Sequence, residues 1–290
     1  MYEKILAPLD GSKEAEYALC YVEMIAAKFH SEVTLLNATT MGNLMERPWR
    51  AYLEKNVEWL QSLGIEAFPI VVRDFPANAV LNFAHNNNIG LIVLCAHTQS
   101  GARQWALGDV ARKVLYATHV PVLLVKPTAQ AVSQVQLRKV LVPLDGSLYS
   151  EASLPYVKQL VEGSEAEVMF LRVANSPTTP VDRPELSWEE YRKVLMEDAH
   201  RQNLKYLEEV RNRFDGGEKV TTHALQGNAA QIIVRFARDN NVDLIAMTTH
   251  GSTSIARWVY GSVANRVVEE TLQPVILIRP DTVSMEEARA

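Results

Sequence analysis

Short runs of apolar residues alternate along the chain with stretches in which apolar residues recur every three or four positions. Residues 4–10, KILAPLD, form the first run, and a short run of this kind is typical of a buried strand in a parallel sheet. After Ser12 the apolar positions fall on one face of a helix, and they are Ala15, Ala18, Leu19, Val22, Ile25, Ala26 and Phe29. The pattern predicts a strand followed by an amphipathic helix.

The same alternation occurs five times in each half of the chain. The predicted strands lie at residues 4–10, 33–36, 67–72, 91–95 and 122–125, and then at 139–145, 168–171, 220–225, 244–247 and 275–278. The longest predicted helices lie near residues 50–63 and 188–214, and others begin near Ala77 and Ala230. Because no hairpin signal separates the strands, we expect a parallel, doubly wound α/β sheet in each half.

The two halves are copies of one another. Residues 91–109, LIVLCAHTQSGARQWALGD, match residues 244–262, LIAMTTHGSTSIARWVYGS, and His97 and His250 lie 153 positions apart (250 − 97). We therefore expect two tandem domains, residues 1–128 and 137–281, each with a five-stranded, mostly parallel sheet. A polar loop at 175–184 and a longer helix after it lengthen the second copy.

Composition excludes several classes of protein. Of the 290 residues 48% are hydrophobic and 22% are charged, with a net charge of -5, so we expect a globular protein that binds neither nucleic acid nor a membrane. Cys20 and Cys95 are isolated, which favours buried free thiols in a reducing compartment. The chain passes from Met1 directly into a strand-like pattern, so we expect no secretory signal and a cytoplasmic protein.

Candidate chemistry gathers where the fourth strand of the second half ends. Gly251 and the pair Gly261-Ser262 would let main chain approach a ligand closely, and the N–H groups that open the next helix would favour an anion. An ordinary glycine-rich loop is an equally good interpretation of this stretch alone. In a doubly wound sheet the loops after strands one and four meet at the switch point, so Asp145 and Gly251 are expected to converge.

Asp145 ends the first strand of the second half, as Asp10 does in the first, and each is followed by Gly-Ser. Its carboxylate could orient a ribose hydroxyl or a base edge, but a helix cap and turn is the commoner role of such a triplet. We expect Ser12 and Ser147 to be N-caps. No P-loop, dinucleotide fingerprint, nucleophile elbow or zinc motif is present, and His97 and His250 lack a nearby nucleophile, so we expect no catalytic residues and no metal ligands.

At these residues the chain resembles a tandem universal stress protein, with two domains of that family covering essentially all residues. The family signature is G-x2-G-x9-G-[ST], and the second half keeps Gly251 and Gly261-Ser262 but has Thr248 for the first glycine. By this resemblance, members with the full signature bind ATP, sometimes with Mg or Mn, whereas other members bind none, and dimerisation through the last strand is common. The binding residues that we expect are Pro143, Leu144, Asp145, Val173, Thr248, Gly251, Ser252, Gly261, Ser262 and Val263.

The first half departs further from the signature. It has Cys95 and Thr98 for the first two glycines and Asp109 for the serine. A carboxylate at Asp109 is expected to cap its helix and to repel phosphate from the same N–H groups, so we expect the first half to bind no ATP. For the second half, Thr248 leaves ATP binding an open question. Its backbone N–H is kept, but its branched side chain could obstruct a phosphate.

Two functions from different classes fit this pattern. The first is a cytoplasmic stress-response protein that binds ATP or a related adenine nucleotide in its second domain, without strong catalysis. The alternative is a nucleotide-free interaction or scaffold protein of the same fold. An enzyme of the wider adenine-nucleotide alpha-hydrolase-like group is disfavoured, because no catalytic constellation is found. We also expect the strands at Val122 and Val275 to pair antiparallel, so that the two halves form an internal pseudo-dimer. The sequence does not decide whether two whole chains form a homodimer.

Overall fold

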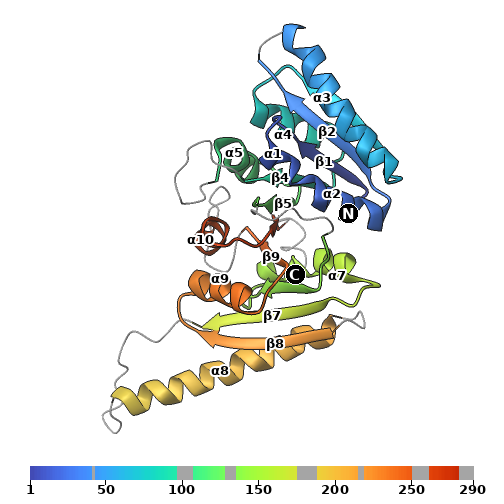
Figure 1. Ribbon diagram of the computed structural model, residues 1–290. Coiled ribbons are helices and arrows are strands. Elements are labelled where there is room, and N and C mark those ends of the chain that lie inside the picture. Colours follow the sequence, from blue (N-terminus) through green and yellow to red (C-terminus); the bar gives the residue numbers. More distant parts are fainter. Residues whose placement is uncertain are drawn as a thin grey trace. The chain divides into compact units, whose positions relative to one another are not determined.

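The chain folds as two compact α/β units in a computed structural model (Figure 1). The structure describes residues 1–40, 43–96, 107–127, 135–174, 188–214, 219–249 and 261–280. Unit 1 comprises Met1–Gln136 together with Leu272–Asp281, and unit 2 comprises Leu137–Thr271. The predicted linker at 129–136 and loop at 175–184 lie wholly or largely outside the described residues.

Unit 1 is built around a parallel sheet in the order β3-β2-β1-β4-β5, to which β10 is added antiparallel. Its elements are β1 (Lys4–Pro8), α1 (Lys13–Glu16), α2 (Leu19–Phe29), β2 (Glu32–Ala38), α3 (Asn43–Ser62), β3 (Ala67–Val72), α4 (Pro76–Asn86), β4 (Leu91–Cys95), α5 (Asp109–Ala117), β5 (Val122–Val125) and β10 (Val275–Ile278). The predicted doubly wound fold is confirmed.

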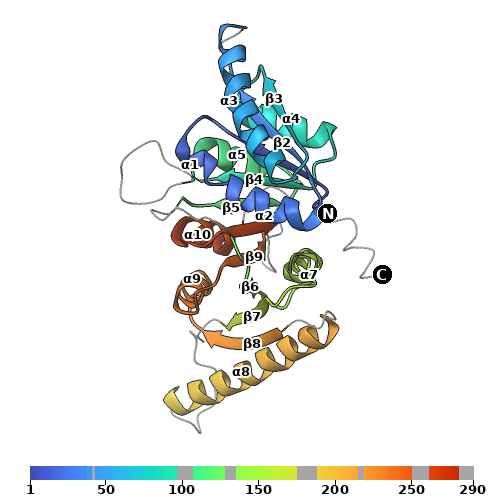
Figure 2. The ribbon, with the colours of Figure 1, turned by 45° about the vertical axis from the view of Figure 1, so that its right-hand side comes forward.

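Unit 2 repeats this plan with the strand order β9-β6-β7-β8, in which all neighbours are parallel. Its elements are β6 (Lys139–Pro143), α6 (Leu148–Glu151), α7 (Leu154–Val161), β7 (Glu167–Ala174), α8 (Trp188–Arg213), β8 (Lys219–Gln226), α9 (Ala229–Asp239), β9 (Leu244–Thr248) and α10 (Ser262–Glu270). Figure 2 shows α9 and α10 on one face of this sheet and α7 on the other.

Burial on both faces explains why the strands read as continuous apolar runs. The inner residues of β1 and β6 are fully covered, and Val140, Leu141 and Val142 are each 0% exposed. On the α8 side of the unit 2 sheet, Phe170 of β7 meets Phe214 edge-on at 5.3 Å between ring centroids. Among the described residues, no helix combines the length and apolar composition that a bilayer-spanning segment needs.

Two helix predictions need correction. The helix expected after Ser12 is divided into α1 and α2, because the Ala18 N–H donates to Ala15 only three residues back and tightens the turn. In unit 2 the corresponding division precedes Pro155, which has no N–H to donate. Helix α3 begins at Asn43, earlier than expected, and contains Pro48. Pro48 lies beyond the first turn and has no N–H to donate, so one hydrogen bond of α3 is lost there, but the helix continues to Ser62.

The last strand of the chain belongs by its contacts to unit 1. Val275, Ile276 and Leu277 of β10 pair antiparallel with Leu124, Leu123 and Val122 of β5, as predicted. By the sequence repeat this strand belongs to the second domain, whereas most of its contacts in the structure are with unit 1. Without it, β5 would present an apolar edge of unpaired backbone groups. The strand that ends the second repeat thus completes the first unit's sheet.

Candidate functional site

A pocket opens in unit 2 at the point where the sheet changes its winding direction. Neighbouring strands β6 and β9 end there, and doubly wound sheets bind ligands at such a switch point. The pocket is lined by Pro143, Leu144, Asp145, Ser150, Leu171, Val173, Ala229, Ile233, Met247, Thr248, Thr249, Gly261, Ser262, Val263 and Ala264. Eight of the ten predicted site residues are in this set, while Gly251 and Ser252 lie outside the described residues.

The pocket has an apolar wall that the sequence analysis did not include. Leu171 and Val173 come from β7, Ile233 from α9 and Met247 from β9. The cavity measures about 120 Å³, close to the roughly 150 Å³ that holds a benzene ring in a protein core.

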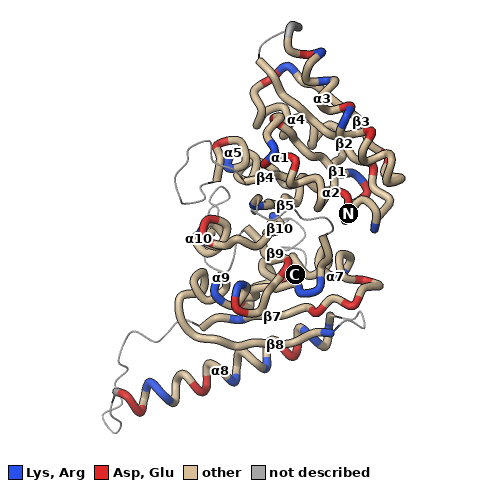
Figure 3. Tube along the Cα trace, in the orientation of Figure 1, with Lys and Arg blue, Asp and Glu red and all other residues tan. Residues whose placement is uncertain are grey.

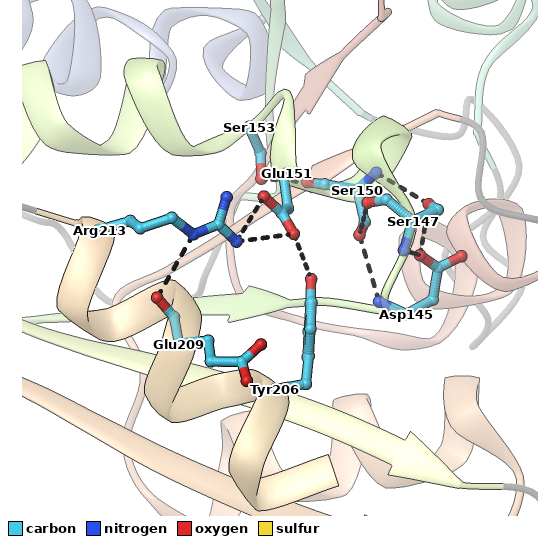
Figure 4. Close-up of polar contacts among 8 residues, drawn as sticks. All are labelled: Asp145, Ser147, Ser150, Glu151, Ser153, Tyr206, Glu209 and Arg213. Atoms are coloured by element: carbon cyan, nitrogen blue, oxygen red, sulfur yellow. Dashed lines mark hydrogen bonds and ion pairs between the residues drawn. The ribbon is translucent and has the colours of Figure 1, made fainter. Parts of the chain in front are cut away.

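The turn between β6 and α6 brings a carboxylate to the pocket in a fixed conformation (Figure 4). Asp145 Oδ1 accepts hydrogen bonds from the Ser147 N–H (2.9 Å) and from its hydroxyl (2.6 Å). Ser147 Oγ in turn accepts from the Ser150 N–H (3.2 Å) and caps α6, as predicted. Asp145 thus acts in the turn and lines the pocket as well.

Ser150 was missed by the sequence analysis and is central to this turn. Its hydroxyl accepts from the Asp145 N–H (3.3 Å) and donates to the Ser147 carbonyl (2.8 Å), and the residue is only 5% exposed. Unit 1 has Ala15 at the corresponding position. A serine that replaces an apolar residue on the buried face of a predicted helix was the available signal.

The first turn of α10 forms the opposite end of the pocket. Gly261 is its N-cap, and the Gly261 N–H donates to the Thr249 carbonyl (2.8 Å), which holds the helix start beside the end of β9. The N–H groups of Ser262 and Val263 have no acceptor within the helix, and the positive end of the helix dipole lies there. Gly261 has φ -57, which any residue can adopt. The glycine therefore contributes space at the pocket and not an unusual backbone.

Two threonines close the β9 end of the pocket. Thr248 and Thr249 line it and are only 6% and 4% exposed. Thr248 stands where the family signature has its first glycine, so its branched side chain occupies part of the wall. The sequence leaves open whether this side chain obstructs a phosphate, and the structure places Thr248 at the β9 end of the cavity.

Unit 1 has the same turn but a different helix start. Asp10 Oδ1 accepts from the Ser12 N–H (3.0 Å) and hydroxyl (2.6 Å). Gly108 is the N-cap of α5 and Asp109 is its first residue, so the prediction that Asp109 caps the helix was wrong. The charge of Asp109 nevertheless lies in the first turn of α5.

Cys95, at the end of β4 in unit 1, has a raised pKa. Burial, together with the charges of Asp10 and Glu14, raises the pKa of Cys95 to about 12.

Both histidines considered in the sequence analysis, His97 and His250, lie outside the described residues. Within the described part of the chain, no group of three or more His, Cys, Asp or Glu side chains could hold a metal ion.

The sequence matches a family model twice, at residues 1–126 and 136–279, and the model describes the Universal stress protein family. The chain belongs to this family. Universal stress protein MJ0531 of Methanocaldococcus jannaschii is 32% identical over 143 residues, which are 49% of this chain and 82% of that protein. Universal stress protein MJ0577 of the same organism is 28% identical over 50% of this chain and 96% of its own length.

A solved structure extends the similarity in fold to nearly the whole chain. The crystal structure of a universal stress protein from Archaeoglobus fulgidus has a TM-score of 0.73 and 20% identity, and the match covers 96% of this chain and 99% of that one. The curated relatives each match about half of this chain. Two universal stress protein domains in tandem account for both observations.

Proposed function

We propose that this universal stress protein binds ATP or a related adenine nucleotide in the pocket of unit 2. The observation that carries the proposal is the convergence of three features on one cavity. A carboxylate-bearing turn, an apolar wall and the N-terminus of a helix whose N-cap is a glycine line it together. These features match the three parts of a nucleotide: ribose hydroxyls, base and phosphate.

Each part of the ligand has a complementary group in the pocket. The base lies in the apolar cavity bordered by Pro143, Val173 and Met247, and Asp145 faces the ribose. Phosphate oxygens accept from the N–H groups of Ser262 and Val263, as anions commonly do at helix N-termini. Mg²⁺ or Mn²⁺ would accompany the phosphates.

Unit 1 is proposed to bind no nucleotide. Asp109 opens α5 at the position of Ser262 in α10. Two like charges about 4 Å apart near a protein surface repel by on the order of 4 kcal/mol before screening by salt. That repulsion is enough to cancel a few phosphate hydrogen bonds.

We propose a non-catalytic role in the cytoplasmic stress response, in which nucleotide occupancy is itself the signal. Among the described pocket residues no histidine stands beside the hydroxyls of Ser150 and Ser262, and Oδ1 of the Asp145 carboxylate is already engaged by Ser147. Ser150 is already engaged in the turn. Binding without turnover is the function that these groups support.

The test compares two glycines in equivalent positions. Gly261→Val should lower ATP affinity at least about 100-fold, because a branched side chain would project beside the phosphate-binding N–H groups. The backbone at Gly261 suits valine, so the fold should survive. Gly108→Val in unit 1 is the matched control and should leave affinity unchanged. Wild-type affinity in Gly261→Val, measured by calorimetry, would contradict the proposal.

The buried Thr248 side chain favours a second candidate, a nucleotide-free interaction protein of the same fold. Thr248→Gly distinguishes the two. If the wild-type protein binds ATP, this variant should bind as well or better. If ATP binds only the variant, the wild-type pocket is closed and the second candidate holds.

A further inference from the structure

A cluster of charged and aromatic side chains joins α8 to the turn that carries Asp145. The Tyr206 hydroxyl donates to Glu151 Oε1 at 2.9 Å, and the Arg213 guanidinium lies 3.1 Å from Glu151 Oε2. Only 13% of the Glu151 side chain is exposed. Figure 4 shows Tyr206 and Arg213 reaching from α8 to this one carboxylate, whose residue directly follows Ser150 in the chain. Two residues of the long helix thus hold the last residue of α6.

Arg172 of β7 makes a second contact with the same turn. The Arg172 guanidinium lies 4.5 Å from the centre of the Tyr206 ring. One of its terminal nitrogens is 2.5 Å from where a Cβ at Gly146 would be, and Gly146 has φ +89. Arg172 therefore covers the residue that follows Asp145, and Tyr206 supports Arg172.

Unit 1 has a tyrosine near the corresponding glutamate, but the buried Tyr52 hydroxyl makes no hydrogen bond among the described residues and the basic residues are not present at the matching positions. Tyr52 of α3 lies near Glu16, the counterpart of Glu151, and burial followed by the charge of Glu16 raises the pKa of Tyr52. Asn37 stands where unit 2 has Arg172, and the last turn of α3 has no basic residue. The last turn of α8 has Arg211 and Arg213. The charged connections thus occur in the unit that has the pocket.

Helix α6 needs such support, since it is only four residues long. A single turn has too few internal hydrogen bonds to be stable alone. Its Ser150 accepts from the Asp145 N–H, so any movement of α6 is passed to the pocket. Figure 3 shows acidic and basic residues interspersed along α8. Tyr206 is one of the α8 residues that point away from this solvated surface, toward α6.

We propose that Glu151 and Tyr206 are positioning residues, which fix the Asp145–Ser150 turn from α8 and so set the affinity of the pocket. The affinity part rests on the proposed function, whereas the fixing of the turn does not. Burial and then Glu151 raise the pKa of Tyr206 further above its ordinary value, so its hydroxyl remains a donor to Glu151. Neither residue lines the pocket.

The test is Tyr206→Phe, which removes the hydroxyl and keeps the ring beneath Arg172. Tyr52→Phe is the matched control in unit 1. Amide hydrogen exchange should speed up at least about fivefold in peptides covering residues 145–151 of Tyr206→Phe. Exchange in α9 should not change, and exchange in this turn should not change in Tyr52→Phe. ATP affinity should fall about tenfold in Tyr206→Phe alone.

The outcomes separate this proposal from the previous one. Unchanged exchange in the turn would overturn it, and so would faster exchange with wild-type ATP affinity, which indicates a purely structural contact. If wild-type protein binds no ATP, the proposed function fails, and the exchange measurement still decides whether α8 fixes the turn. Glu151→Gln keeps an acceptor for Tyr206 and should restore most of the protection that Glu151→Ala loses.

Discussion

At the level of single residues, Asp145 shows how a turn can be rigid and still face a ligand. Its Oδ1 accepts hydrogen bonds from Ser147, its N–H donates to the Ser150 hydroxyl, and the residue lines the pocket. A carboxylate held in place in this way loses little freedom when a ligand binds, which favours affinity. The same triplet in unit 1 lacks the Ser150 hydroxyl.

Ser147→Ala tests the cap itself. Removing an N-cap hydroxyl costs about 1 kcal/mol of stability, and the Ser147 hydroxyl also donates to Asp145. Ser12→Ala should cost a similar amount, because Ser12 makes the same two bonds with Asp10 and Ala15. Urea denaturation followed by circular dichroism measures both, and unchanged midpoints in both variants would contradict the assigned role.

Cys95 predicts a pH dependence. Its folded pKa of about 12 lies above its ordinary value of 9.0, so the unfolded chain loses this proton first. Stability from this group is therefore present below pH 9 and falls as pH rises toward 12. In native protein at pH 8, a disulfide reagent should leave Cys95 unmodified and modify it after denaturation. Rapid labelling of Cys95 in the native state would contradict its assigned environment.

At the level of elements, the two helix starts α5 and α10 differ by one charge. Ser262→Asp gives α10 the first residue of α5. It should stabilise the helix by about 0.3–1 kcal/mol through the helix dipole, while lowering ATP affinity at least about tenfold. Calorimetry and thermal denaturation measure the two effects. Unchanged affinity would show that phosphate does not meet this helix.

The elements also show what the sequence could predict. Every strand was predicted to within about three residues at each end, because most of them are buried parallel strands that read as uninterrupted apolar runs. Strand β8 contains Thr221, Thr222 and His223 and is not such a run; the sequence repeat pairs it with β3. The division of α1 from α2 depends on one tightened hydrogen bond at Ala18, which no apolar pattern reveals. Ser150 and Ile233 reach the pocket through tertiary packing from other elements, so motif spacing around Gly251 and Gly261 could not identify them.

At the level of the whole molecule, the chain's last strand stabilises its first unit. Ile276 of β10 is 1% exposed and pairs with Leu123 of β5. Ile276→Pro should remove a ladder hydrogen bond and increase hydrogen exchange in β4 and β5, with no change in β7 or β8. Ile276→Val is the control. Unchanged exchange in β5 would contradict the assignment of β10 to unit 1.

The central claim is that one pocket, in unit 2, binds an adenine nucleotide. Calorimetric titration of nucleotide-stripped protein with ATP, with and without Mg²⁺, tests it most directly. We predict about one ATP per chain, because Asp109 opposes phosphate in unit 1. Binding of two ATP molecules per chain would contradict the proposal that unit 1 binds no nucleotide. No detectable binding would contradict the proposed nucleotide pocket in unit 2.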